Sequence, residues 1–257
     1  MLFGVIGGTG FYRVTETAEA EQIRVETPYG PVQIERTRLG EVEIAFLARH
    51  GTGHSIPPHR VNYRANIAAL KQIGVTNILA SAAVGSLSEA MPPGSLAILT
   101  QFLDFTHSRA STFYDGESGE VVHVDMSDPY CSHLRGELAS AADSLGVKVF
   151  AEATYVCAEG PRFETPAEIR MFRQLGGDLV GMTNVPEVVL AREAGLCYAT
   201  IAVVTNWAAG VSKEPIKHGE VSGFMDKQTP RIRAIFEKTI ADHKEIACSC
   251  RSSCPSQ

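Results

Sequence analysis

The sequence has no excess of basic residues and no long apolar run. Lys and Arg number 23 against 29 Asp and Glu, which gives a net charge of −6 at pH 7. Proteins that bind nucleic acids draw most of their affinity from neutralising phosphates, so this charge balance argues against a nucleic-acid partner. No apolar stretch approaches the roughly 20 residues that a membrane helix needs. We therefore expect neither a nucleic acid nor a membrane as a partner.

A secretion signal is also lacking. The apolar start of the chain, Met1 to Phe11, has no basic leader and no small-residue cleavage site. It contains four glycines, which suit a strand and a turn better than a signal peptide. The sequence therefore predicts a cytoplasmic protein.

The composition is that of an ordinary globular protein, with 44% hydrophobic and 20% charged residues among 257. A chain of this length can bury one sizeable core, and no repeat, low-complexity stretch or linker divides it. We predict a single domain over residues 1–246, followed by a cysteine-containing C-terminal tail over residues 247–257.

The six cysteines fall into a body group and a tail group. The tail pair Cys248 and Cys250 is too short for a two-pair zinc site, and no histidine follows it, so no metal site is predicted. Two interpretations stay open. The cysteines are either reduced surface thiols, or they form the disulfides Cys248–Cys250 and Cys131–Cys197 as an aid to stability.

The order of the expected elements predicts an α/β fold. A buried strand over residues 2–6 runs into a glycine loop, and alternating segments between residues 20 and 48 predict a meander of antiparallel strands. From residue 61 onward helices alternate with strands, which indicates a sheet covered by helices on both faces. The expected helices are 61–73, 134–145, 166–175, 185–194 and one after residue 218; the expected strands are 77–83, 147–156, 178–182 and 198–204.

The glycine loop Gly7–Gly10 is the first candidate anion site. Its backbone N–H groups can approach an anion closely, and Thr9 adds a hydroxyl donor. Such a loop also opens dinucleotide-binding folds, so an oxidoreductase stays open as an alternative. Against it, no helix of convincing period follows Gly10.

A second anion motif, Arg49-His50, follows the strand that ends near residue 47. A guanidinium can clamp a phosphate bidentately, and the neighbouring imidazole can donate a further hydrogen bond. His54 and His59 lie close by. A metal site there would need a carboxylate or thiolate, and no acidic residue occurs between positions 44 and 88.

Three later strands end in polar groups that suit a nucleoside. Phe163 can stack on a flat base, and Glu164 can accept hydrogen bonds from ring N–H groups. Met182 can line a sugar pocket, while Thr183 offers a hydroxyl at a helix start. The amide of Asn206 can both donate to a base and accept from it. Ligands of such sheets bind outside the carboxyl ends of the strands, so we expect these groups to converge.

The motifs together resemble a known family. They run in the same order from residue 4 to about residue 210, and they resemble the methylthioadenosine and methylthioinosine phosphorylase branch of the trimeric purine nucleoside phosphorylases. The blocks are residues 7–10, 26–30, 48–51, 61–66, 113–116, 159–163, 182–183 and 185–188.

The resemblance implies a fold, a reaction and site residues. The fold is a single α/β domain with a central, mixed, distorted sheet flanked by helices. The reaction needs no metal and no organic cofactor, inorganic phosphate is a co-substrate, and the protein is a homotrimer or a dimer of trimers. By position, Met182 would lie against the ribose and Phe163 on the purine. Phosphate would be held by Thr9, Arg49, His50, the backbone at Ala83, and Thr183.

The departures from the family pattern concern the base and the sugar. Adenosine-specific members carry Asp where this chain has Asn206 and Ala208. An amide can donate to a 6-oxo oxygen or to N7, and Glu164 stands where 6-oxopurine phosphorylases place the acceptor for N1–H. These changes resemble the methylthioinosine phosphorylases most. His218 falls near a histidine that serves the 5′-hydroxyl in inosine and guanosine phosphorylases; it is either that residue or a surface residue at a helix start.

We therefore predict phosphorolysis of a 6-oxopurine nucleoside, S-methyl-5′-thioinosine or inosine and guanosine, to free base and a ribose 1-phosphate. Asn206, Glu164 and His50 are the predicted catalytic residues. The alternatives are S-methyl-5′-thioadenosine phosphorylase, a nucleosidase that uses water, a non-catalytic nucleoside-binding protein, and the oxidoreductase.

Overall fold

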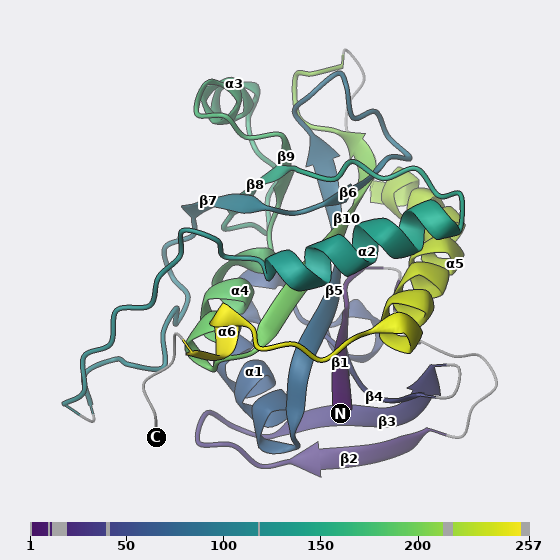
Figure 1. The fold of residues 1–257 in the computed structure, drawn as a ribbon. Coiled ribbons are helices and arrows are strands. Elements are labelled where there is room, and N and C mark those ends of the chain that lie inside the picture. The colour runs from purple at the N-terminus through teal and green to yellow at the C-terminus, as the bar shows by residue number, and fades with distance from the viewer. Residues whose placement is uncertain are drawn as a thin grey trace.

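One mixed β-sheet organises the chain in the computed structural model, which describes residues 2–9, 11, 20–39, 42–117, 119–212 and 218–252. Ten strands form the sheet within this described part, and helices cover both of its faces (Figure 1). The predicted fold class is confirmed. The strands are β1 (Leu2–Gly7), β2 (Glu21–Val25), β3 (Val32–Leu39), β4 (Val42–Ala48), β5 (Val75–Ser86), β6 (Leu96–Ile98), β7 (Gln101–Phe105), β8 (Thr154–Ala158), β9 (Leu179–Gly181) and β10 (Cys197–Trp207).

The long strand β5 lies at a fork in the sheet. Its first half pairs with β1 in parallel, and nearly its whole length pairs with β10 in parallel. Its last two residues, Gly85 and Ser86, also pair with β9, which runs the opposite way. The sheet continues from β1 through β4 and β3 to β2, and from β9 through β8 to β7, while β6 pairs with β10. The predicted meander of β2, β3 and β4 is antiparallel.

The helices are α1 (Tyr63–Gln72), α2 (Ser132–Ser144), α3 (Pro166–Gln174), α4 (Asn184–Glu193), α5 (His218–Asp242) and α6 (Ser249–Ser252). Helices α1 and α4 pack on one face of the sheet, and α2 and α5 pack on the other. None of the described helices is long and apolar enough to cross a bilayer.

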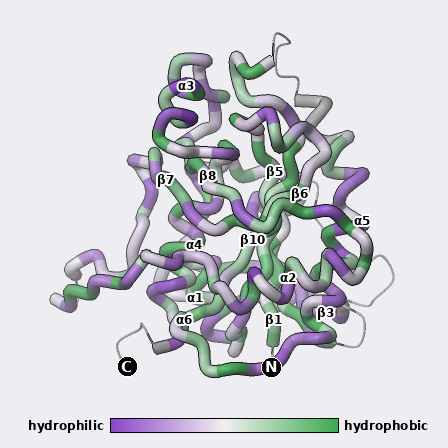
Figure 2. Tube along the Cα trace, turned by 45° about the horizontal axis from the view of Figure 1, so that its top comes forward, coloured by the Kyte–Doolittle hydropathy of each residue, from purple (hydrophilic) through white to green (hydrophobic). Residues whose placement is uncertain are grey.

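Alternation along the central strands supplies a core to both faces. In β5, Ile78 packs toward α1 and α4, while its neighbour Leu79 packs toward α2 and α5. Strand β10 repeats the pattern with Ala202 and Ile201. Figure 2 shows the resulting concentration of apolar chain along β1, β5 and β10. Strands buried on both faces appear in the sequence as continuous apolar runs, which is why β5 and β10 were predictable.

Helix α3 begins at the residue that the sequence predicted. The hydroxyl of Thr165 accepts a hydrogen bond from the backbone of Glu168 at 3.2 Å, and the Glu168 carboxylate accepts one from the Thr165 backbone at 2.7 Å. This capping box and Pro166 at the first helical position satisfy or remove the free N–H groups of the first turn. The loop before α3, which carries Phe163 and Glu164, is thereby fixed at its end.

The strand predicted over residues 147–156 is wrong over its first seven residues. Strand β8 begins only at Thr154. Upstream of it, Phe150 makes a single bridge to Ala97 in β6, with hydrogen bonds to Leu96 and Ile98. The segment is apolar enough to resemble a strand, but one bridge replaces a ladder there. The short strands β6 and β7 were not predicted.

The cysteines match neither interpretation in full. All five in the described part are free thiols, so neither expected disulfide forms there, and Cys254 lies outside the described residues. They are not surface thiols either, because Cys131, Cys197 and Cys250 are buried.

Candidate active site

A cavity of about 590 Å³ lies beside the fork of the sheet, between residues that follow β1, β4 and β9 and residues within β5 and β10. Every predicted site residue except His218 lines it. They are Thr9, Arg49, His50, Ala83, Phe163, Glu164, Met182, Thr183, Asn206 and Ala208. His218 is the first residue of α5, and its side chain lies outside the described part of the chain.

The backbone of the turn after β1 lies close to the buried side chain of Arg49. The N–H of Gly8 donates to Ser81 Oγ at 3.2 Å. A Cβ at position 8 would lie 2.8 Å from the carbonyl oxygen of Ser81 and 2.9 Å from Nη1 of Arg49. Only glycine fits at such a close approach. Because residue 8 is glycine, the Gly8-Thr9 backbone can lie directly beside the Arg49 guanidinium.

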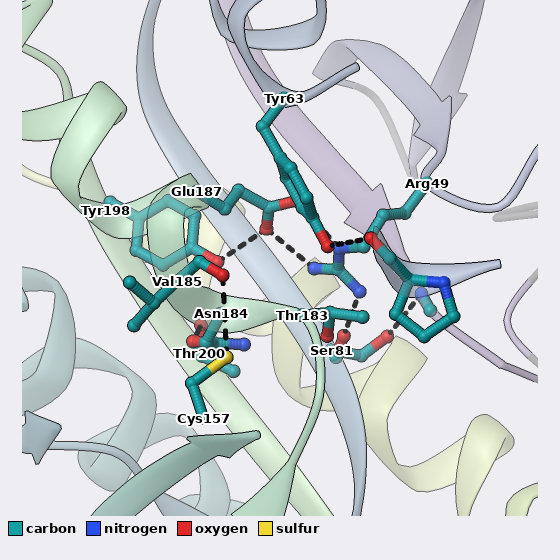
Figure 3. A network of polar contacts seen from close by, with 12 residues as sticks. Arg49, Tyr63, Ser81, Cys157, Thr183, Asn184, Val185, Glu187, Tyr198 and Thr200 are labelled. Carbon is teal, nitrogen blue, oxygen red and sulfur yellow. Dashed lines mark hydrogen bonds and ion pairs between the residues drawn. The ribbon is translucent and has the colours of Figure 1, made fainter. Parts of the chain in front are cut away.

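Arg49 is held by a buried carboxylate. Its Nε and Nη2 donate to the two oxygens of Glu187 at 2.7 and 2.6 Å, and Nη1 donates to the Ser81 carbonyl at 2.9 Å (Figure 3). Both ionised side chains are fully buried. Burial alone would lower the pKa of Arg49, but the charge and hydrogen bonds of Glu187 raise it above its ordinary value. The guanidinium is therefore permanently charged and fixed in orientation.

Further polar groups hold Glu187 in turn. The hydroxyl of Tyr198 donates to Glu187 at 2.6 Å from β10 (Figure 3). One turn earlier in α4, the Asn184 side chain accepts from Tyr130 at 3.2 Å and from Thr200 at 3.0 Å. Buried polar groups need such partners, and these link α4 to the sheet behind the cavity.

His50 is a neutral side chain with one ring nitrogen already engaged. Burial, followed by the charge of Arg49, lowers its pKa to about 4. Its Nδ1 lies 2.8 Å from the carbonyl oxygen of Ile56. Because a carbonyl only accepts, Nδ1 carries the proton and Nε2 is the acceptor of the neutral ring. The predicted donation from His50 to phosphate therefore requires protonation of Nε2.

The start of α4 offers a free hydroxyl to the cavity. Thr183 is the N-cap residue of α4, but its side chain makes no capping hydrogen bond to the helix. Its backbone N–H donates to Tyr155 at 3.0 Å, which fixes the residue against β8. Thr183 is buried and lines the cavity together with Arg49.

Glu164 presents an unsatisfied carboxylate oxygen. Its side chain is 8% exposed, and its Oε1 is buried with no hydrogen-bond partner in the described part of the chain. Burial raises the pKa of this carboxyl. Leaving such an acceptor unpaired costs about 1–3 kcal/mol or more, so the position favours a ligand that donates. Phe163, next to it, is 43% exposed at the cavity rim.

Asn206 is turned into the cavity by an irregularity in β10. The register between β10 and β5 shifts at this point, so that Val204 pairs with Val84 but Asn206 pairs with Gly85. Such bulges re-aim a side chain. The Asn206 oxygen accepts from the Thr205 hydroxyl at 2.9 Å, and its amide nitrogen donates to the Trp207 carbonyl at 2.9 Å. Asn206 thus lies within β10, not after its end as predicted, and Ala83 lies within β5, not at its last residue as predicted.

Sequence reasoning assigned no role to Glu187 or Ser81, and it weighed His54 only as a metal ligand or an ordinary loop residue. His54 lines the cavity and stacks on His50 with ring centroids 4.3 Å apart, whereas His59 lies away from it. A signal for Glu187 did exist. It is the one acidic residue among the apolar positions of a helix start, and a buried carboxylate needs a cation.

The whole domain, not only the site, matches proteins already known. The family model described as the phosphorylase superfamily matches residues 2–241. The chain belongs to this superfamily. The membership confirms the family that the motifs predicted.

Individual relatives of this phosphorylase are similar over nearly the full length. A protein of Pyrococcus furiosus named 6-oxopurine nucleoside phosphorylase is 50% identical over 255 residues, covering 97% of this chain and 96% of the relative. A probable S-methyl-5′-thioinosine phosphorylase of Methanopyrus kandleri is 49% identical over 92% of this chain and 91% of the relative. Among solved structures, methylthioadenosine phosphorylase of Schistosoma mansoni with adenine has a TM-score of 0.89 and 38% identity, covering 93% of this chain and 90% of that one.

Proposed function

We propose that this chain catalyses phosphorolysis of a 6-oxopurine nucleoside, releasing the free base and a pentose 1-phosphate. Inorganic phosphate is the co-substrate, and the reaction uses no metal or organic cofactor. S-methyl-5′-thioinosine and inosine or guanosine are the candidate substrates. The cavity of about 590 Å³ is within the usual range for a small-molecule site.

The phosphate half of the cavity is assigned to Thr9, Arg49, His50, the backbone at Ala83, and Thr183. Three contacts to Glu187 and Ser81 use three of the five N–H groups of the Arg49 guanidinium, so two remain for an anion. A phosphate dianion beside His50 favours its protonated ring, which opposes the effect of Arg49 and restores Nε2 as a donor. Protonation of His50 is thus coupled to phosphate binding.

The base half is assigned to Phe163, Glu164 and Asn206, and the single observation that carries it is the unpartnered Oε1 of buried Glu164. A 6-oxopurine carries N1–H, a donor that this oxygen lacks. A 6-aminopurine has a bare N1, which would face the carboxylate with two acceptors opposed. Ala208, which lines the cavity without a polar side chain, offers no acceptor to a 6-amino group.

Catalysis follows from holding phosphate and base on opposite sides of the sugar. Phosphate approaches the anomeric carbon as the bond to N9 lengthens, and its negative charge stabilises the oxocarbenium character of the ribose, which packs on Met182. Asn206 donates to the departing base, and Glu164 orients it. No side chain forms a covalent bond in this scheme.

The experiment is base release from methylthioinosine, inosine and methylthioadenosine, each with and without phosphate. Phosphate-dependent release of hypoxanthine from the first two, with little release from the third, is expected. Preferred cleavage of methylthioadenosine would make the base assignment wrong and favour S-methyl-5′-thioadenosine phosphorylase. Release without phosphate would replace phosphorolysis with hydrolysis. The ratio between the first two substrates tests the 5′-hydroxyl role of His218.

We propose that the enzyme works as a homotrimer or a dimer of trimers in the cytoplasm, with the domain ending near residue 246. Light scattering coupled to size exclusion gives the mass directly. A mass equal to the 27.7 kDa of one chain would contradict the oligomer.

A further inference from the structure

Four cysteine thiols from three distant segments meet near the start of β10, whereas Asn206 of the proposed site lies near the other end of that strand. Cys131 precedes α2, Cys197 begins β10, and Cys248 and Cys250 belong to the C-terminal segment around α6. Their four Sγ atoms all lie within 4.8 Å of one another, with Cys131 and Cys248 at 3.5 Å. In Figure 1 the C-terminal helix α6 lies beside one end of α2. Neither the nucleoside nor the phosphate assignment uses any of these residues.

The arrangement suits one central ion better than two fixed pairs. A disulfide bonds its two sulfurs at about 2.05 Å, whereas all four thiols here are free and each lies within 4.8 Å of the three others. Four thiolates bound tetrahedrally at about 2.3 Å from Zn²⁺ lie about 3.8 Å from each other. The observed spacing requires only small side-chain movements to reach that geometry.

Positive charge lies close to the cluster. Cys131 is the N-cap residue of the 13-residue helix α2, whose N-terminus carries partial positive charge. The Arg251 side chain lies within hydrogen-bonding reach of the Cys197 thiol. The positive charge of buried Arg192 also acts on Cys250. Arg192 and Arg251 can therefore offset the negative charge of a metal tetrathiolate.

We propose that Cys131, Cys197, Cys248 and Cys250 bind one structural Zn²⁺ ion. The four thiols release four protons to solvent, and four thiolates with Zn²⁺ form a centre of net charge −2 without any redox step. Cys248 is half-buried and gives the ion a route in, while the other three ligands are buried. The ion fastens the C-terminal segment to the starts of α2 and β10. The tail pair alone could not form such a site; the two body cysteines complete it.

Metal content of the full-length enzyme, purified without chelator or histidine tag, tests the proposal. About one Zn²⁺ per chain is expected, and Co²⁺ substitution should give the visible absorption of a tetrahedral thiolate centre. Cys250→Ser and Cys131→Ser should lose the metal. Cys157→Ser is the matched control, because Cys157 is equally buried but lies outside the cluster, and it should retain a full equivalent.

Thiol titration in denaturant without reductant distinguishes the competing outcomes, and it needs no folded variant. Zinc with all six cysteines titratable after chelation supports the proposal. No metal and four fewer reactive thiols would mean two disulfides in place of the ion, and would overturn it. No metal with all thiols reactive would also overturn it, and an equivalent of iron would overturn the choice of zinc. None of these outcomes depends on the nucleoside assignment.

Discussion

Arg49 and Glu187 form a bidentate ion pair in which neither side chain is exposed, joining the end of β4 to the first turn of α4. The pair places a fixed cation at the edge of a cavity without leaving a lone charge in the interior. The arginine therefore needs its carboxylate before any substrate arrives.

Replacing Glu187 by Ala should destabilise the fold. The substitution leaves the Arg49 guanidinium buried without a counter-charge and removes the acceptor of the Tyr198 hydroxyl, and breaking such a pair costs about 3–5 kcal/mol. The free energy of unfolding from urea titration measures the loss. Glu159→Ala, which removes a partly exposed partner of Arg109, serves as the comparison. A loss below about 1 kcal/mol for Glu187→Ala would contradict a structural role for the pair.

The low pKa of His50 makes stability depend on pH on the acid side. The folded-state pKa is about 4 against an ordinary value of 6.5, so between these values the unfolded chain binds a proton that the folded chain does not. Stability should fall as pH drops from about 6.5 to about 4, by up to about 3 kcal/mol from this residue, and should not depend on it above pH 7. Urea titrations at pH 7 and pH 5 in phosphate-free buffer measure the difference.

The control for that experiment is His50→Asn, whose amide can still donate to the Ile56 carbonyl. The variant should lose less stability than the parent over the same pH interval, because it has no group to protonate. Equal losses in the two proteins would assign the acid sensitivity to other residues.

Glu164→Gln should weaken catalysis on 6-oxopurine nucleosides selectively. The amide presents a weaker acceptor to N1–H, and loss of a hydrogen bond to a charged group is worth about 1.5–3 kcal/mol, or roughly 10- to 150-fold in kcat/KM. Steady-state rates with inosine and with a purine nucleoside that lacks N1–H give the comparison. A similar fall for both substrates would show that Glu164 positions the loop and does not read the base.

The double substitution Asn206→Asp with Ala208→Asp should shift preference toward 6-aminopurines. A carboxylate at position 208 would accept from the exocyclic amine, and a protonated Asp at position 206 would donate to N7. The ratio of kcat/KM for methylthioadenosine over methylthioinosine should rise by roughly 10-fold or more. Ala208→Asn, which adds similar volume without charge, is the control. An unchanged ratio would move base selection elsewhere in the cavity.

The local sequence pattern predicted most of the fold, because strands buried on both faces and helices with clear start signals can be recognised from neighbouring residues alone. The apolar runs of β1, β5 and β10 and the Thr165-Pro166 start of α3 are of this kind. The short strand β6 has three residues and no alternation to detect. Strand β8 was extended too far upstream, since an apolar segment with a single bridge resembles one with a full ladder.

The candidate site was predictable where one residue type implies one chemistry, and less so where partners are distant in sequence. Thr183, Glu164 and Asn206 each follow or end a strand, so their convergence could be expected. Glu187 lies 138 positions from Arg49, and the residues around each of them do not indicate that the two side chains form a pair. The four clustered cysteines were missed for the same reason, since the tail pair was judged without the two thiols that the fold brings to it.

The fork at β5 fixes the distance between the phosphate half and the base half of the cavity. Ala83, assigned to phosphate, and Gly85, which pairs with Asn206 of β10, are two residues apart on one strand, a separation of about 6.6 Å. Because both points belong to the same strand, which pairs with β10 along this stretch, their spacing cannot adjust to the molecule that enters. The enzyme should therefore measure the length between the anion and the base, and reject analogues in which that length is changed even when every polar group is kept.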